Sequence, residues 1–242
     1  MPPWPYPFWF AHRGAGSLAP ENTLAAFRTG AKYGFQAFEC DIKLSADGIL
    51  YLMHDDLLDR TTNMSGPAQL QPWKALSLLD AGGWHGPRFA GEAPASLAAI
   101  TAFCLANGYQ LNLEIKPCPG SERSTGYAVA CWVQNHWPPG LTLPLLSSFN
   151  INSLAAVAEE GPQLPRALLL DTLPTKPAQQ AIDLGCCALI IEHTLITPAL
   201  INKAHWQGLR ILAYTVNDAA QARRLKSWGI DGLITDSMDS AR

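Results

Sequence analysis

The chain has 242 residues, with 17 basic against 20 acidic side chains and a formal net charge of −3. Because 48% of the residues are hydrophobic and no basic run occurs, the composition indicates a folded protein and argues against a nucleic-acid binder or a protein held on anionic membranes. No stretch approaches the ~20 consecutive apolar residues of a membrane span, so we predict a soluble, cytoplasmic protein with no membrane anchor.

The apolar start, Met1–Ala11, is broken by four prolines and lacks the basic region of a signal peptide. Short apolar runs then alternate with segments of helical periodicity. The predicted strands are Phe8–His12, Ala37–Leu44, Gln110–Lys116, Leu143–Phe149, Arg166–Asp171, Ala188–His193, Arg210–Val216 and Gly232–Thr235. The predicted helices are Asn22–Tyr33, Ser96–Asn107, Gly126–His136, Ile151–Glu160, Pro177–Leu184, Thr197–Trp206 and Asp218–Trp228. This alternation predicts a TIM (β/α)8 barrel, with a doubly wound open sheet as the alternative.

One connection is much longer than a barrel loop needs. Residues 55–95 carry five glycines and four prolines but no secure strand or long helix, whereas a βα loop normally takes about 2–6 residues. We predict that 55–95 is a small insertion after the second strand, packed over one mouth of the barrel. We expect residues 1–242 to form a single domain.

The second predicted strand carries charge where a barrel strand should be apolar. In Glu39–Lys43 every second side chain is charged, and these side chains share one face because a strand has a period of two. In the third strand the polar side chains of Asn112, Glu114 and Lys116 alternate with apolar ones in the same way. The carboxylates that we expect to point into the barrel are Glu39, Asp41 and Glu114.

Three carboxylates at one place need a positive partner to stay ionised together. Lys43 and Lys116, on the same faces, offer salt bridges as one interpretation. The other is a divalent cation held by Glu39, Asp41 and Glu114, because a set of oxygen ligands suits Mg²⁺ or Ca²⁺ rather than zinc. The convergence of the three carboxylates favours the metal site.

Two histidines lie at predicted strand ends. His12 ends the first strand, and His54 ends the apolar run Ile49–Met53. TIM-barrel active sites are built at the carboxyl ends of strands, where a pair of imidazoles can take one proton and give another. Arg13 adds a planar cation suited to binding a phosphate. With the carboxylates, these residues predict hydrolysis of a phosphate ester.

Seven short motifs occur in order over almost the whole chain, from about residue 10 to residue 236. They are His12-Arg-Gly14, Pro20-Glu-Asn-Thr23, Glu39-Cys-Asp41, His54-Asp55, Glu114-Ile-Lys116, Tyr214-Thr-Val-Asn217 and Asp231-Gly-Leu-Ile-Thr-Asp236. In this order and spacing they resemble the glycerophosphodiester phosphodiesterase family. The chain is most similar to the short cytoplasmic bacterial members of that family.

The resemblance implies a TIM barrel with a small insertion after the second strand. The site residues that it implies are His12 and His54 as general acid and base, Arg13 and Lys116 on the phosphate, and Glu39, Asp41 and Glu114 as ligands of one divalent cation, Mg²⁺ or Ca²⁺. Tyr214 stands where the family usually has tryptophan and is expected to line the glycerol side of the site. Asn22 is expected to support the site, although it or Thr23 can also cap the first helix.

The implied reaction is metal-dependent hydrolysis of a small-molecule glycerophosphodiester, such as glycerophosphocholine or glycerophosphoethanolamine, to sn-glycerol 3-phosphate and an alcohol. Attack by water and attack by the substrate's 2-hydroxyl through a cyclic phosphate both fit, as do a monomer and a homodimer. A lyase that stops at the cyclic phosphate and a lysophospholipid-cleaving enzyme are alternatives. A catalytically inactive binding protein is disfavoured because both histidines and all three carboxylates are present.

Overall fold

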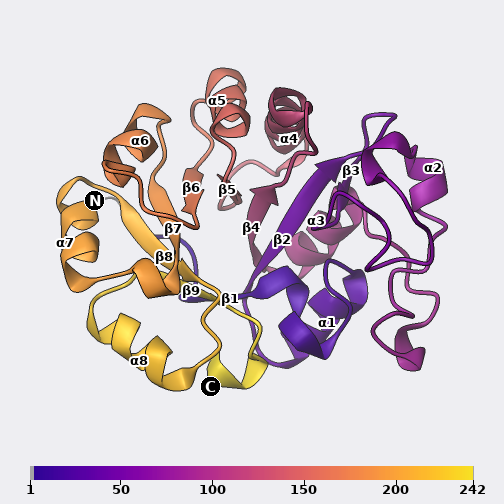
Figure 1. The fold of residues 1–242 in the computed structure, drawn as a ribbon, viewed down its shortest axis with the longest axis horizontal. Coiled ribbons are helices and arrows are strands. Elements are labelled where there is room, and N and C mark those ends of the chain that lie inside the picture. The colour runs from indigo at the N-terminus through magenta and orange to yellow at the C-terminus, as the bar shows by residue number, and fades with distance from the viewer. Residues whose placement is uncertain (1–2, 242) are drawn as a thin grey trace.

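In the computed structural model, which describes residues 3–241, eight parallel strands close into a barrel (Figure 1). The barrel strands are β1 (Trp9–Ala11), β2 (Ala37–Leu44), β4 (Gln110–Ile115), β5 (Leu145–Ser148), β6 (Arg166–Leu170), β7 (Ala188–Glu192), β8 (Arg210–Tyr214) and β9 (Gly232–Thr235). Strand β1 pairs with both β9 and β2 and so closes the ring. This confirms the TIM barrel over the open sheet. Residues 1, 2 and 242, which the predicted domain includes, lie outside the described residues.

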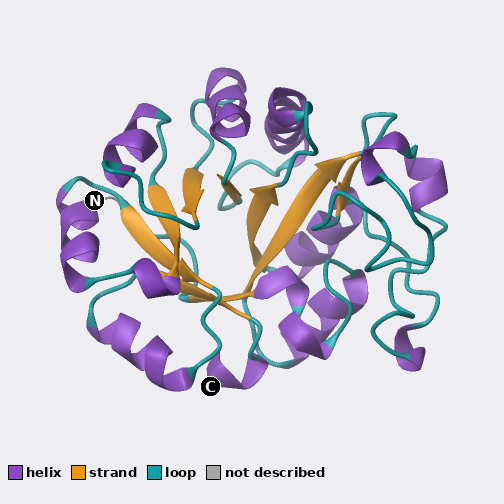
Figure 2. Ribbon diagram, viewed as in Figure 1, coloured by secondary structure: helices purple, strands orange, loops and turns teal. Residues whose placement is uncertain are grey.

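Helices pack around the outside of the strands (Figure 2). They are α1 (Leu24–Lys32), α3 (Leu97–Asn107), α4 (Glu122–His136), α5 (Ile151–Glu160), α6 (Pro177–Asp183), α7 (Pro198–Trp206) and α8 (Ala219–Ser227). Most begin after a polar residue whose side chain accepts a hydrogen bond from the first turn, as N-caps do. These caps are Thr23, Ser96, Asn150, Thr197 and Asp218.

A short hairpin places His54 beside the barrel mouth. Strand β3 (Leu50–Leu52) runs antiparallel to the last three residues of β2, Ile42–Leu44. The hairpin returns the chain to the level of Asp41, whose carbonyl oxygen accepts a hydrogen bond from the Met53 amide at 3.0 Å. His54 therefore follows the carboxyl end of β3, an antiparallel strand that lies outside the ring of parallel strands. The hairpin brings it to the same mouth by another route.

The long connection after β3 has little regular structure of its own. It contains the short helix α2 (Trp73–Leu76) and the 3-10 turns Ala68–Leu70 and Pro87–Phe89. A small apolar core holds it together, formed by Tyr51, Met53, Leu58, Ala68 and Leu76. Two of its side chains, His85 and Arg88, contact backbone oxygens of the loop between β1 and α1. The connection lies beside β2 and α1, at the right of Figure 1.

The opposite end of the barrel is closed by the start of the chain. Tyr6 is buried with Phe10 and other inward-facing strand residues, and its hydroxyl donates to the Leu143 carbonyl at 2.9 Å. A cavity of about 450 Å³ lies here, lined by Trp4, Tyr6 and residues that precede the strands. It is remote from the predicted site residues. Within residues 3–241, no helix has the length and hydropathy of a membrane span.

Candidate active site

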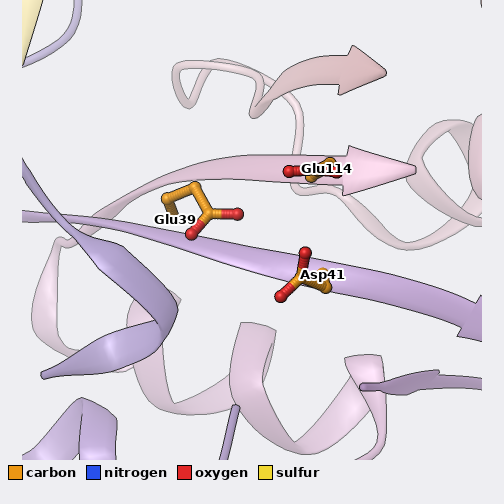
Figure 3. Close-up of side chains that lie close together, drawn as sticks. All are labelled: Glu39, Asp41 and Glu114. Atoms are coloured by element: carbon orange, nitrogen blue, oxygen red, sulfur yellow. The ribbon is translucent and has the colours of Figure 1, made fainter. Parts of the chain in front are cut away.

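Three carboxylates from the neighbouring strands β2 and β4 meet on one face of the sheet. Asp41 is in register with Glu114, and Glu39 lies two residues earlier on the same face of β2. One oxygen from each residue lies within 4.8 Å of the others, and all three side chains are buried (Figure 3). Oε1 of Glu39 is buried without a hydrogen-bond partner. This cluster of oxygen donors fits a hard divalent cation.

Burial and the charges around the cluster shift the pKa values of its three carboxylates. Burial raises the pKa of Glu39 to about 8, and the charge of Asp41 adds to this rise. Burial and Asp41 also raise the pKa of Glu114. For Asp41 itself burial acts upward, but Arg13 and Lys116 outweigh it and lower the pKa to about 2. The cations of the protein thus compensate Asp41, whereas a further positive charge at the cluster would favour the ionised form of Glu39.

We expect the chelator-treated protein to lose stability as the pH rises. Because the pKa of Glu39 is raised from 4.5 to about 8 in the folded protein, its contribution to stability is full below its ordinary pKa and is lost as the pH rises through about 8. The loss should reach several kcal/mol and should vanish when saturating Mg²⁺ or Ca²⁺ holds the carboxylates ionised. Urea unfolding between about pH 5 and pH 8 measures this. A flat profile for the chelated protein would contradict it.

The two lysines of the predicted salt bridges have different partners. Lys116 Nζ donates to Glu114 Oε1 at 2.9 Å and lies 3.5 Å from Asp41 Oδ1. Lys43 is fully buried and instead donates to Asp56 Oδ1 at 2.6 Å. The salt-bridge interpretation therefore holds for Lys116 and is wrong for Lys43. The physical reason is the rise of the strand, which carries Lys43 about 7 Å beyond Asp41, where the connection after β3 supplies Asp56.

Asp56→Ala should destabilise the protein more than Lys43→Met. The first substitution leaves a buried ammonium group without its carboxylate, at a cost of up to about 3–5 kcal/mol. The second removes the buried charge and leaves Asp56, whose side chain is 52% exposed, to water. Urea unfolding of both variants measures the difference in the free energy of unfolding, and equal losses would contradict this asymmetry.

His12 follows β1 directly and begins the 3-10 turn His12–Gly14. Its Nδ1 lies 2.6 Å from Oδ1 of Asp236, and its Nε2 lies 3.7 Å from Oε2 of Glu39. Burial lowers the pKa of His12, but the hydrogen bond to Asp236 and the charge of Glu39 outweigh burial and raise it. With Nδ1 held by Asp236, the ring presents Nε2 to the carboxylate cluster.

Arg13 and Asn22, which both follow His12 in the loop between β1 and α1, have a strained backbone conformation. Arg13 has a φ of 50° and Asn22 a φ of 61°, a conformation that costs non-glycine residues about 1–3 kcal/mol and occurs mainly at functional sites. It lets the Arg13 amide donate to Glu39 Oε2 at 3.0 Å and Asn22 Nδ2 donate to Asp41 Oδ2 at 2.8 Å. Thr23 caps α1, so the Asn22 amide serves the carboxylates.

His54 also has an aspartate on its Nδ1. Its Nδ1 lies 2.7 Å from Oδ1 of Asp55. Burial lowers its pKa, and the positive charges of Arg13 and Lys116 lower it further against the opposing effect of the carboxylates. Each histidine therefore has Nδ1 on an aspartate, which leaves Nε2 for another partner.

An aromatic wall borders the cluster at the ends of β5 and β8. Phe149 and Tyr214 stand edge to face with ring centroids 5.7 Å apart. Lys116 Nζ lies 5.7 Å from the Phe149 ring centroid, and the Tyr214 hydroxyl donates to the Leu170 carbonyl at 3.3 Å. Tyr214 was predicted from the motif. Phe149 was not, although a phenylalanine at the carboxyl end of a predicted barrel strand is a usable signal.

Similarity to known proteins identifies the family of this chain. The sequence profile of the glycerophosphoryl diester phosphodiesterase family matches residues 12–240. The chain belongs to this family. A glycerophosphodiester phosphodiesterase of Caldanaerobacter subterraneus subsp. tengcongensis is 30% identical over 234 residues, which cover 95% of this chain and 94% of that protein. The protein is therefore a hydrolase of the phosphodiesterase class.

Solved structures of family members have the same fold. A phosphodiesterase of Oleispira antarctica, in complex with the product sn-glycerol-3-phosphate, matches with a TM-score of 0.93 at 33% identity, covering 98% of this chain and 96% of that chain. A glycerophosphodiester phosphodiesterase of Agrobacterium tumefaciens matches with a TM-score of 0.83 at 29% identity, covering 96% and 97%. The phosphodiesterase activity and a small-molecule substrate follow from these relatives.

Four charged residues of this phosphodiesterase site had no role in the sequence predictions. Asp55 and Asp236 occur in the family motifs, but spacing alone does not indicate that they orient histidines. Glu21 also lies in a motif, and its Oε1 accepts a hydrogen bond from Nη1 of Arg13 at 2.9 Å. Arg60 contacts both Asp55 and Glu21. It lies in the long connection, where no periodicity or motif marks it.

Proposed function

We propose that this enzyme hydrolyses glycerophosphodiesters, such as glycerophosphocholine and glycerophosphoethanolamine, to sn-glycerol 3-phosphate and an alcohol. One divalent cation, Mg²⁺ or Ca²⁺, would bind Glu39, Asp41 and Glu114. The observation that carries the proposal is the meeting of these carboxylates with two aspartate-bound histidines and two cationic side chains. The product bound to the Oleispira antarctica phosphodiesterase supports the choice of product.

Charge stabilisation at the phosphate is assigned to two side chains and the cation. A cation on the three carboxylates would supply a Lewis acid for a phosphate oxygen. Arg13 Nε lies 3.3 Å from Asp41, and Lys116 Nζ lies 2.9 Å from Glu114. Both side chains are partly exposed, which leaves donors for the non-bridging phosphate oxygens. There they would stabilise the negative charge that develops in the transition state.

The proton transfers are assigned to His12 and His54. With each Nδ1 bound to Asp236 or Asp55, each Nε2 is left to act on the substrate. One ring takes the proton of the attacking hydroxyl, and the other gives a proton to the departing alcohol oxygen. Attack by water and attack by the glycerol 2-hydroxyl use the same pair. In the second route a cyclic phosphate forms first and is then opened by water.

The surroundings of the site support two further assignments. Phe149 and Tyr214 are proposed to line the glycerol side of the substrate. The connection 55–95 is proposed to act as an insertion over the mouth within one domain of residues 1–242, and its contacts with the carbonyl oxygens of Ser17 and Leu18 support this. The cytoplasmic location and the monomeric or homodimeric state stay predictions.

Phosphorus NMR of the reaction products tests the proposed reaction. With glycerophosphocholine and either cation, we expect sn-glycerol 3-phosphate as the final phosphorus signal, and proton NMR of the same sample should show free choline in equal amount. Choline phosphate would contradict the proposed cleavage at the choline side. A cyclic glycerophosphate as the end product would make the enzyme a lyase instead of a hydrolase.

A further inference from the structure

Arg60 binds two carboxylates that serve different parts of the site. It lies in the connection 55–95, beyond His54 in the chain. Nε and Nη2 donate to the two oxygens of Asp55 at 2.6 and 2.9 Å. Nη1 and Nη2 donate to the two oxygens of Glu21 at 2.7 and 2.8 Å. Four of the five N–H donors of a guanidinium group are thereby used.

Each of these carboxylates also holds a residue of the proposed machinery. Oδ1 of Asp55 lies 2.7 Å from Nδ1 of His54. Oε1 of Glu21 accepts a hydrogen bond from Nη1 of Arg13 at 2.9 Å. A continuous chain of charged contacts therefore runs from His54 through Arg60 to Arg13.

The surroundings of Arg60 indicate that it orients neighbouring side chains and contributes little to the stability of the folded protein. Its side chain is 44% exposed, and exposed ion pairs contribute only about 0–1 kcal/mol each. Its hydrogen bonds to Glu21 and Asp55 raise its pKa above the usual range. Two forked contacts fix the direction of both carboxylates, which the single ammonium group of a lysine cannot do.

We propose that Arg60 is a positioning residue for both halves of the site. This inference rests on the proposed function, in which His54 moves a proton and Arg13 binds the phosphate. Through Asp55, Arg60 fixes the ring of His54 and so affects kcat. Through Glu21, it fixes the guanidinium of Arg13 and so affects substrate binding and KM. The long connection thereby supplies a residue on which both functions depend.

Arg60→Gln is expected to lower kcat for glycerophosphocholine about 10-fold and to raise KM about 10-fold at saturating cation, because a displacement of ~1 Å in a site costs up to ~10²-fold. Arg60→Lys keeps the charge without the fork and should fall between the wild type and Arg60→Gln. The matched control is Arg88→Gln. Arg88 lies in the same connection, and its partners are the Leu18 carbonyl and the Phe89 ring. Both kinetic constants should be unchanged in this control.

The same substitution in a His54→Ala background separates positioning from a general structural role. Without the imidazole, Asp55 has nothing to orient, so Arg60→Gln should leave the residual kcat unchanged. KM should still rise about 10-fold through Glu21, since KM approximates the substrate Kd in a slow variant. A structural role would lower kcat by the same factor in both backgrounds.

Equal losses in the two backgrounds would overturn the proposal, as would wild-type kcat and KM in Arg60→Gln or in Arg60→Lys. If Arg60→Gln does not fold, Arg60→Lys takes its place in both backgrounds. Full activity of His54→Ala alone would instead overturn the proposed function, so the two failures are distinguishable.

Discussion

Replacing His12 or His54 by alanine is expected to lower kcat at saturating cation by at least ~10²-fold, the usual contribution of a general acid or base. Each imidazole has one nitrogen bound to an aspartate, at 2.6 Å for His12 and 2.7 Å for His54. The other nitrogen is the one available for proton transfer. Release of sn-glycerol 3-phosphate from glycerophosphocholine measures the loss.

The matched control for these variants is His136→Ala. His136 is exposed on α4, where it stacks on Trp132, and its replacement should leave kcat unchanged. Full activity in either His12→Ala or His54→Ala would show that the ring does not transfer a proton and would remove the basis of the proposed mechanism.

Glu39→Gln is expected to lower kcat at least ~10³-fold, because a catalytic cation contributes several kcal/mol to the transition state. The same variant should be at least as stable as the wild type at pH 8 when both are treated with chelator. Glutamine resembles the protonated carboxyl that the raised pKa of Glu39, about 8, favours in the absence of a cation. The variant thus separates the loss of function from the loss of structure.

Two assays check this expectation. Turnover is followed with Mg²⁺ or Ca²⁺ over a range of concentrations, and the free energy of unfolding is measured in urea with chelator present. Glu159→Gln, a substitution on the exposed surface of α5 where Glu159 pairs with Arg123, is the control for both. Wild-type turnover in Glu39→Gln would contradict the assignment of Glu39 as a ligand, and a less stable chelated variant would contradict the protonation of Glu39 in the absence of a cation.

The barrel and its carboxylate cluster are predictable from sequence for one physical reason. Parallel barrel strands are buried on both faces and have a side-chain period of two. The carboxylates of Glu39 and Asp41, two positions apart in β2, and of Glu114 in β4 alternate with apolar side chains and therefore have to face the barrel interior. Because neighbouring parallel strands are in register, Asp41 and Glu114 also come to the same level. The inward face of the strands and the register between them together determine where the carboxylate cluster lies.

The partners of these side chains follow from contacts that local pattern does not encode. Asp236 is 224 positions from His12 in the chain and reaches it because β9 pairs with β1 to close the ring. Lys43 lies on the same face of β2 as Asp41 but two residues further along the strand. At that height its partner is Asp56, which follows β3. Arg60 is placed by an irregular connection whose path depends on its small apolar core.

The most direct test of the proposed metal dependence is a titration. The chelator-treated protein is titrated with Mg²⁺ and, separately, with Ca²⁺, while release of sn-glycerol 3-phosphate from glycerophosphocholine is followed. We predict no turnover before the cation is added and a rise in turnover that saturates as one cation binds per chain on Glu39, Asp41 and Glu114. Activity that survives thorough chelation would contradict the proposed metal dependence.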